Sequence, residues 1–285
     1  MTVAKATTVT LREMKKEQKK IVMLTAYDYP TARAAEEGGA DVILVGDSLG
    51  MVVLGYDTTL PVTMEDMIHH TKAVTRGTKH TMIVTDLPFL SYHISTPEAV
   101  RNAGRLIQEG FADAVKLEGG REILDQVKAI VRAGIPVMGH IGLQPQMVNQ
   151  LGGFKVQGKD FDTALRIFED ALALQEAGCF AIVLECVPTP LARLISEHLT
   201  IPTIGIGAGE ATDGQVLVIH DMLGITEKYL PKFAKKYGEM FADMTNAINT
   251  YATEVRDSAF PTAQHGFIMN DEVLERLQRE INQRS

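Results

Sequence analysis

The sequence alternates short apolar runs with longer amphipathic stretches, and this alternation most limits the folds open to the chain. Apolar strands separated by helical stretches are typical of βα units around a parallel sheet buried on both faces. The runs cover residues 21–26, 41–46, 81–85, 114–117, 136–139, 181–184, 202–206 and 215–219. Eight such runs predict a (β/α)8 TIM barrel, an α/β fold.

The length supports one barrel domain over residues 1–285. The chain has 285 residues, close to the roughly 250 that are typical of this fold. No Ser/Gly-rich linker marks a second domain. An amphipathic stretch around 10–20 predicts an N-terminal helix that closes the barrel bottom. A helical extension from Pro231 to about Val255 is expected to pack on the barrel as a core helix.

Composition excludes several classes of partner. The formal net charge of -8 argues against nucleic acid and anionic membranes, because binding to both depends on excess Lys and Arg. Only two cysteines occur, Cys179 and Cys186, and neither has a metal-ligand spacing, which favours a reducing, cytoplasmic setting. We find no signal-peptide core and no apolar run of membrane-spanning length.

Six of the runs lead directly into an ionisable side chain. Because the C-terminal ends of barrel strands share one rim, these side chains are expected to surround one opening. Crowded carboxylates repel one another unless a hard divalent cation or a bound proton compensates. The six residues are Asp47, Asp86, Glu118, His140, Glu185 and His220.

Asp47 and Asp86 follow neighbouring strands and could reach one Mg²⁺ ion, which needs few protein ligands. The alternative for each is a helix cap or a turn. Lys116 and Glu118 point to the same side of their strand, so Lys116 either pairs with Glu118 structurally or holds a substrate oxyanion. Glu185 lies farther round the rim and is placed to act as a base instead of a ligand.

The remaining candidates are weaker. His140 lies between glycines that leave room for a ligand, although a structural role remains open. His220 is interpreted as structural. Cys186 has no histidine at an activating spacing, so a thiolate nucleophile is not expected. Residues 205–209 (GIGAG) lack the third glycine of a dinucleotide motif, and long connections at 48–61 and 142–158 are candidate lids.

Nine segments of the chain resemble the ketopantoate hydroxymethyltransferase (3-methyl-2-oxobutanoate hydroxymethyltransferase) family. The resemblance covers about residues 25–267, nearly the whole chain. The segments are 25–29 (TAYDY), 44–51 (LVGDSLGM), 59–63 (TLPVT), 86–89 (DLPF), 115–120 (VKLEGG), 139–146 (GHIGLQPQ), 152–158 (GGFKVQG), 184–188 (LECVP) and 204–209 (IGIGAG). The stretch 91–95 is longer than in some relatives, and its role is open.

The resemblance implies a barrel of the phosphoenolpyruvate mutase and isocitrate lyase type. It implies transfer of a one-carbon unit from 5,10-methylenetetrahydrofolate to 3-methyl-2-oxobutanoate, giving ketopantoate, with Mg²⁺ as cofactor and a homo-oligomer, commonly a decamer. The family residues correspond here to metal ligands Asp47, Asp86 and Glu118, the last directly or through water; to keto-acid contacts Asp47, Ser48, Asp86 and Lys116; and to the base Glu185.

The chemistry expected of such a site agrees with these roles. A 2-oxo acid can chelate Mg²⁺, which stabilises the enolate formed when Glu185 removes the C3 proton. His140 is our candidate for contact with the new hydroxymethyl oxygen. Two alternatives are a Mg²⁺-dependent aldolase or lyase that needs no tetrahydrofolate, and a keto-acid-binding protein without catalysis. The sequence gives no indication of the folate-binding residues.

Overall fold

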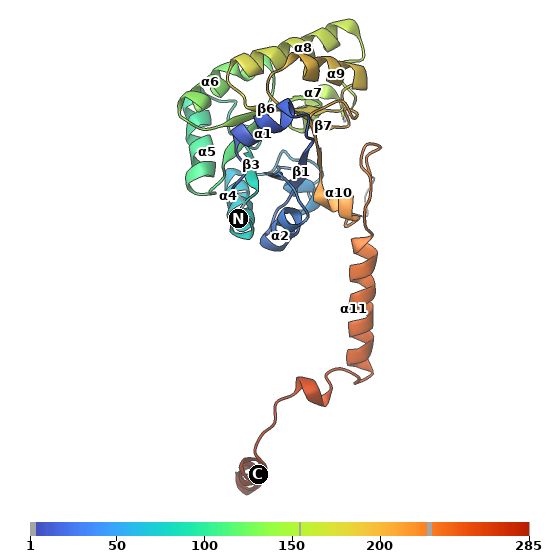
Figure 1. Cartoon of the computed structure of the whole chain (residues 1–285). Coiled ribbons are helices and arrows are strands. Elements are labelled where there is room, and N and C mark those ends of the chain that lie inside the picture. Colours follow the sequence, from blue (N-terminus) through green and yellow to red (C-terminus); the bar gives the residue numbers. More distant parts are fainter. Residues whose placement is uncertain (1–3, 154, 227–229, 285) are drawn as a thin grey trace. The chain divides into compact units, whose positions relative to one another are not determined.

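A computed structural model describes residues 4–153, 155–226 and 230–284 (Figure 1). Eight parallel strands pair in sequence order, and β8 pairs with β1 to close a barrel. The predicted (β/α)8 fold is therefore confirmed. The strands are β1 Ile21–Thr25, β2 Val42–Val45, β3 Met82–Asp86, β4 Ala114–Glu118, β5 Val137–Gly142, β6 Ala181–Glu185, β7 Thr203–Ile206 and β8 Gly214–Leu217.

Helices cover the outer face of the barrel (Figure 1). The connection from β7 to β8, residues 207–213, contains no helix. The helices after the other strands are α2 Tyr29–Glu37, α3 Leu49–Val52, α4 Met64–Gly77, α5 Thr96–Gln108, α6 Leu124–Arg132, α7 Val148–Leu151, α8 Phe161–Glu176, α9 Thr189–His198 and α10 Ile219–Leu223. Short 3₁₀ turns at Arg121–Ile123 and Pro145–Met147 precede α6 and α7.

Residues that alternate along each strand divide between two apolar cores. Outward-facing residues such as Ile43, Ile83 and Leu117 pack with the surrounding helices. Inward-facing residues such as Met23 and Val84 fill the barrel interior. The strand period of two produces this division, because successive side chains point to opposite faces.

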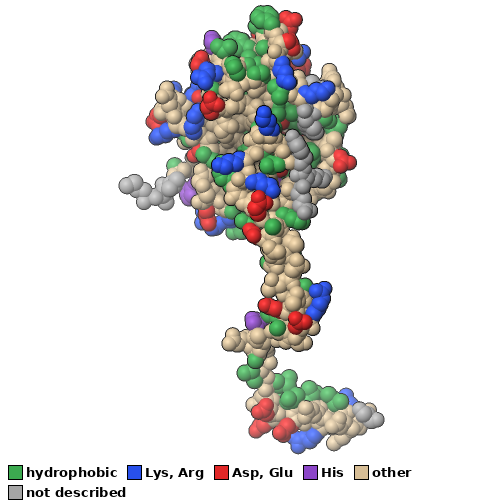
Figure 2. Space-filling view, turned by 90° about the vertical axis from the view of Figure 1, so that its right-hand side faces the viewer, with side chains coloured by type: hydrophobic (Ala, Val, Ile, Leu, Met, Phe, Trp, Pro, Cys, Tyr) green, Lys and Arg blue, Asp and Glu red, His purple; other side chains and the backbone are tan. Residues whose placement is uncertain are grey.

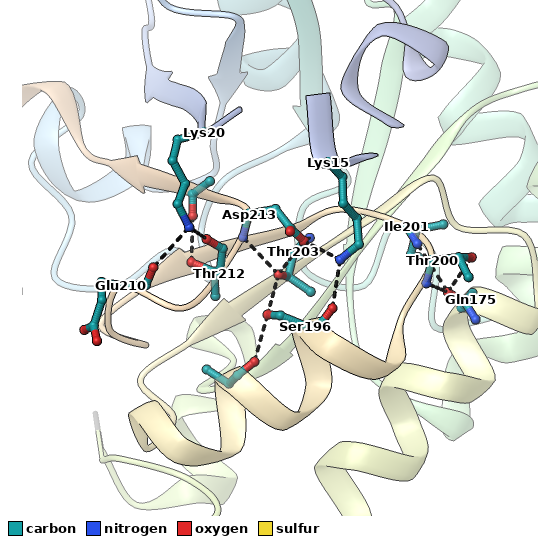
Figure 3. Close-up of polar contacts among 12 residues, drawn as sticks. Lys15, Lys20, Gln175, Ser196, Thr200, Ile201, Thr203, Glu210, Thr212 and Asp213 are labelled. Carbon is teal, nitrogen blue, oxygen red and sulfur yellow. Dashed lines mark hydrogen bonds and ion pairs between the residues drawn. The ribbon is translucent and has the colours of Figure 1, made fainter. Parts of the chain in front are cut away.

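The N-terminal helix α1, Thr8–Lys16, closes the bottom of the barrel as predicted. Its Leu11 is completely buried within the interior cluster, and such burial stabilises the fold by roughly 1.5–3 kcal/mol. Lys15 Nζ lies 2.7 Å from Asp213 Oδ2 and donates to the Ser196 carbonyl at 2.8 Å (Figure 3). Asp213 also accepts from the backbone N–H of Thr203 at 2.8 Å. This network joins α1, α9 and the bottoms of β7 and β8.

The chain forms two compact units. The first, Met1–Tyr237, contains the complete barrel, and the second is Gly238–Ser285. The second contains α11 Met240–Arg256, a 3₁₀ turn at Ala263–His265 and α12 Asp271–Arg284. The C-terminal helical extension is thus confirmed, but it begins at Met240 instead of Pro231. The expectation of a core helix was wrong for the single chain, because no α11 residue is buried. The single domain over 1–285 stays a prediction.

Both helices of the second unit expose hydrophobic side chains, and those of the terminal helix α12 are visible in Figure 2. On α11 these include Met244, Ile248 and Tyr251, and on α12 they include Leu277 and Ile281. The apolar periodicity from which a core helix was predicted is therefore real. It specifies a face to be covered without specifying what covers it.

Candidate active site

Charged side chains occupy the top layer of the barrel interior. On β3 to β6 the lower inward-facing residues are apolar and belong to the interior cluster. The same period of two then places ionisable residues inward at the C-terminal ends. These residues are Asp86 on β3, Lys116 and Glu118 on β4, His140 on β5 and Glu185 on β6.

Strand register determines which of these side chains are neighbours. Asp86 is the direct partner of Lys116 across β3 and β4, and Glu118 is the partner of His140 across β4 and β5. Glu185 pairs with Gly142, two positions beyond His140. The register therefore assembles a continuous arc of ionisable groups from β3 to β6.

Three buried carboxylates meet at one side of this arc and form what we call the carboxylate cluster: Asp47, Asp86 and Glu118. The backbone N–H of Asp47, in the turn after β2, donates to Asp86 Oδ2 at 3.1 Å. Burial, and then the charges of Asp86 and Glu118, raise the pKa of Asp47 well above its ordinary value. Burial also raises the pKa of Asp86, although Lys116 opposes this shift. Asp47 and Asp86 are thus poorly compensated and favour an added cation or proton. Burial also acts to raise the pKa of Glu118, but His140 and Lys116 outweigh it and lower that pKa.

Lys116 supplies the one ammonium group in contact with this carboxylate cluster among the described residues. Its Nζ lies 3.1 Å from Asp86 Oδ1 and 3.1 Å from His140 Nδ1. Burial lowers the pKa of Lys116, but Asp86, Glu118 and Asp47 more than offset this and raise it. The sequence left open a structural ion pair between Lys116 and Glu118. In the structure Lys116 instead forms its ion pair with Asp86, and its ammonium remains charged.

Gln146 organises the carboxylates, and sequence reasoning missed it as a site residue. Its Nε2 donates to Asp47 Oδ2 at 2.8 Å and to the Leu87 carbonyl at 3.0 Å, and its backbone N–H donates to Glu118 Oε2 at 3.0 Å. The Tyr92 hydroxyl lies 2.9 Å from Gln146 Oε1. Both side chains are buried. The only signal was their position, in the GHIGLQPQ segment and in the 91–95 loop.

His140 joins the carboxylate cluster to Glu185. Its Nδ1 lies 3.5 Å from Glu118 Oε1, and its Nε2 lies 3.0 Å from Glu185 Oε2. The second contact has the distance of an ion pair without the direction of a hydrogen bond. Burial and Lys116 lower the pKa of His140, but Glu118 and Glu185 outweigh them and raise it to about 9. The imidazole therefore lies between two carboxylates.

Tyr27 and Ser48 form a further pair beside the cluster. The Tyr27 hydroxyl and Ser48 Oγ lie 2.8 Å apart, and burial raises the pKa of Tyr27, so the phenol stays neutral. His220 packs against the Tyr27 ring with 5.4 Å between centroids. That contact agrees with the structural interpretation of His220, which does not line the cavity described below.

A cavity of about 640 Å³ opens over these groups. Its lining includes every residue predicted for the site, namely Asp47, Ser48, Asp86, Lys116, Glu118, His140 and Glu185. Lys155 and Val156 from the predicted lid at 142–158, and Ser48, Met51, Val52 and Thr59 from the one at 48–61, also line it. A groove of about 490 Å³ at the start of α5 contains none of the predicted residues. Cys186 also lines the cavity, but burial raises the pKa of its thiol to about 12, so it is no thiolate nucleophile.

The carboxylate oxygens of this site meet the needs of a divalent cation in part. In the part of the chain that the structure describes, no group of three His, Cys, Asp or Glu side chains is arranged to hold a metal. Glu118 Oε2 is occupied by the Gln146 N–H. Asp86 Oδ1 is buried without a well-directed hydrogen bond, and Asp47 beside it lines the same cavity. Two oxygen ligands of this kind fit Mg²⁺, which keeps several waters.

The sequence is similar to a family of enzymes. The family model described as ketopantoate hydroxymethyltransferase matches residues 5–263. A 3-methyl-2-oxobutanoate hydroxymethyltransferase of Carboxydothermus hydrogenoformans is 59% identical over 273 residues, which cover 96% of this chain and 99% of the relative. One of Enterococcus faecalis is 58% identical with the same coverage.

Solved structures with the same fold are more distant in sequence. A phosphonopyruvate hydrolase in complex with oxalate and Mg²⁺ has a TM-score of 0.60 at 12% identity, covering 97% of this chain and 96% of the other. A 2,3-dimethylmalate lyase, described as a member of the PEP mutase/isocitrate lyase superfamily, has a TM-score of 0.53 at 15% identity, covering 96% of each. Within the described residues, no helix combines the length and apolarity needed to cross a membrane.

Proposed function

The chain belongs to the ketopantoate hydroxymethyltransferase family and is a transferase, and from this premise we propose that it converts 3-methyl-2-oxobutanoate to ketopantoate with 5,10-methylenetetrahydrofolate as one-carbon donor. The observation that carries the proposal is the division of the cavity. On one side of the cavity, Asp47 and Asp86 offer oxygen ligands for a cation. On the other side lies Glu185, at the end of β6 and beyond His140. A keto acid between them has its carbonyl at one side and its C3 proton at the other.

Asp47 and Asp86 would hold Mg²⁺ directly, and Glu118 would act through water because the Gln146 N–H already occupies one of its oxygens. When bound, the cation polarises the 2-oxo group and lowers the cost of an enolate. Lys116 would bind a keto-acid oxygen through its charged ammonium. Ser48, held by Tyr27, would donate to the same substrate.

Glu185 would remove the C3 proton as general base. The contact with His140 at 3.0 Å orients its carboxylate, and the cavity gives it access to substrate. Water takes the methylene carbon from the two folate nitrogens as formaldehyde and protonates both nitrogens, which releases tetrahydrofolate. The enolate then adds to the formaldehyde carbon and forms the carbon–carbon bond, and the proton held by Glu185 passes to the resulting alkoxide, whose oxygen came from water. His140, whose Nε2 lies beside Glu185, is suited to contact the oxygen of the new hydroxymethyl group.

A test separates these steps. We expect Glu185→Gln to slow deuterium exchange at C3 of 3-methyl-2-oxobutanoate by about 10²–10⁴-fold while Mg²⁺-dependent keto-acid binding persists. Exchange at the native rate would remove Glu185 as base. Full turnover with excess EDTA would exclude the cation, and turnover without the folate would favour an aldolase or lyase.

Assembly and location form part of the same proposal. The exposed apolar faces of α11 and α12 support a homo-oligomer, for which a decamer is the expected size. The free cysteines support a cytoplasmic location. Analytical ultracentrifugation measures the assembly directly, and a monomer at micromolar concentration would contradict it.

A further inference from the structure

One arc of the cavity has no role in the keto-acid chemistry. It extends from the end of β7 through β8 to α10 and residues 226 and 231–233, and its wall is apolar, with Ile206, Val216 and Val218. A cavity of about 640 Å³ lies within the roughly 300–1,000 Å³ that accommodate drug-sized ligands. A small 2-oxo acid on the carboxylate side therefore leaves this arc free for a second, larger molecule.

Asp221 is the one acidic side chain on this arc among the described residues that line the cavity. It lies in the first turn of α10 and is half-buried. Thr226 is its hydrogen-bonding partner, while burial raises its pKa. A carboxylate in an apolar wall retains acceptor positions that a ligand can satisfy best with two parallel N–H donors.

An aromatic ring stands on the same arc. An added Cβ at Gly207, after β7, would lie 2.9 Å from Phe233 Cδ1 and 3.2 Å from Cys186 Sγ. Glycine at 207, with φ of 66°, thus lets the Phe233 ring approach the strand ends next to Glu185. Phe233 is 38% exposed and lines the cavity, so its ring is open to a flat partner.

Two lysines complete the arc. Lys155, from the β5–α8 connection, and Lys232, beside Phe233, line the cavity and are exposed. Their charge is opposite to that of Asp221. The arc therefore provides one carboxylate, one aromatic face and two cations, in an otherwise apolar surface.

We propose that this arc is the folate site, in which Asp221 accepts from the N3–H and 2-amino group of the pteridine, Phe233 stacks on the ring, and Lys155 and Lys232 bind the glutamate carboxylates. The assignment rests on the proposed use of a folate donor. It accounts for three features of that molecule: the hydrogen-bonding edge of the pteridine, its ring face and the anionic tail. It also brings the donor carbon beside Glu185, where the enolate forms.

The test compares Asp221→Asn with Glu210→Gln, which removes the same charge at an exposed position outside the cavity. Tetrahydrofolate binding is measured by calorimetry with Mg²⁺ and keto acid present. Loss of a paired, charge-assisted contact weakens binding about 10- to 100-fold, and we expect this for Asp221→Asn only. A folate analogue with methyl in place of the 2-amino group should bind both Asp221→Asn and native protein equally weakly.

C3 deuterium exchange of the keto acid needs no folate and reports whether each variant retains the rest of the site. Native tetrahydrofolate affinity in an exchange-competent Asp221→Asn protein would overturn the assignment. If that variant loses exchange, Phe233→Leu replaces it, with the same expected weakening. Absence of tetrahydrofolate binding to the native protein would instead refute the folate donor itself.

The lysines are tested with the length of the glutamate tail. Native protein should bind tetrahydrofolate triglutamate more tightly than the monoglutamate, and Lys155→Gln/Lys232→Gln should remove the difference. The salt dependence of triglutamate binding should fall in parallel, because two charge contacts are lost. A difference that persists in the double variant would place the tail elsewhere.

Discussion

Replacing Lys116 by Met tests how far the Lys116 ammonium compensates the negative charge of the carboxylate cluster. The ammonium lies 3.1 Å from Asp86 Oδ1, with both side chains about 5% exposed. At an effective dielectric constant near 20, unit charges at that distance attract by about 5 kcal/mol. Most of this is offset by burying the ions, but removing one partner leaves buried carboxylates uncompensated. Such a change costs about 3–5 kcal/mol of unfolding free energy.

The assay is urea unfolding of Lys116→Met and native protein at pH 8, with EDTA and then with Mg²⁺. We expect the loss of about 3–5 kcal/mol in EDTA and a partial recovery with Mg²⁺, because the cation compensates the same carboxylates. Adding Asp86→Asn to Lys116→Met should recover part of the loss without metal. A loss under about 1 kcal/mol, or one unaffected by both Mg²⁺ and Asp86→Asn, would refute the balance described here.

Two further predictions concern hydrogen bonds to carboxylates. Gln146→Leu removes the donor to Asp47 Oδ2 and should weaken Mg²⁺ binding about 10- to 100-fold, as loss of an orienting partner does; unchanged affinity by calorimetry would contradict this. Burial raises the pKa of Glu36, but the backbone N–H groups of His80, Thr81 and Lys79 outweigh it and lower the pKa to about 2. The stability from Glu36 is therefore present above its ordinary value of 4.5 and lost as pH falls towards 2. Glu36→Gln should flatten that part of the acid-unfolding curve, and an unchanged slope would exclude the contribution.

Local sequence signals were sufficient for most of the barrel. All eight predicted strands are present within a few residues, because buried parallel strands need continuous apolar runs. Helix starts are equally local: Thr63 and Ser95 cap α4 and α5 through their own side chains. The packing of the C-terminal helix was harder to predict, because an apolar helix face does not indicate which surface covers it.

Within the site, residues at or just after the strand ends were predictable and those farther along the connections were not. Lys116, Glu118 and Glu185 follow from a period of two and the common direction of the strands. Gln146 reaches the carboxylates, and Asp221 reaches the cavity, from connections whose path no period describes. In the glycine-rich segment 205–209, Gly207 admits the Phe233 ring to the strand ends.

The sequence by itself determined the barrel and the rim on which the ionisable groups stand. Strand period and strand direction are properties of the local chain, so they can be read from residue order alone. Only the tertiary structure decided that Lys116 pairs with Asp86 instead of Glu118, that His140 lies between two carboxylates, and that Gln146 joins Asp47 to Glu118. Those choices depend on strand register and burial, because the strength of a charge contact is set by distances across strands and by exclusion of water.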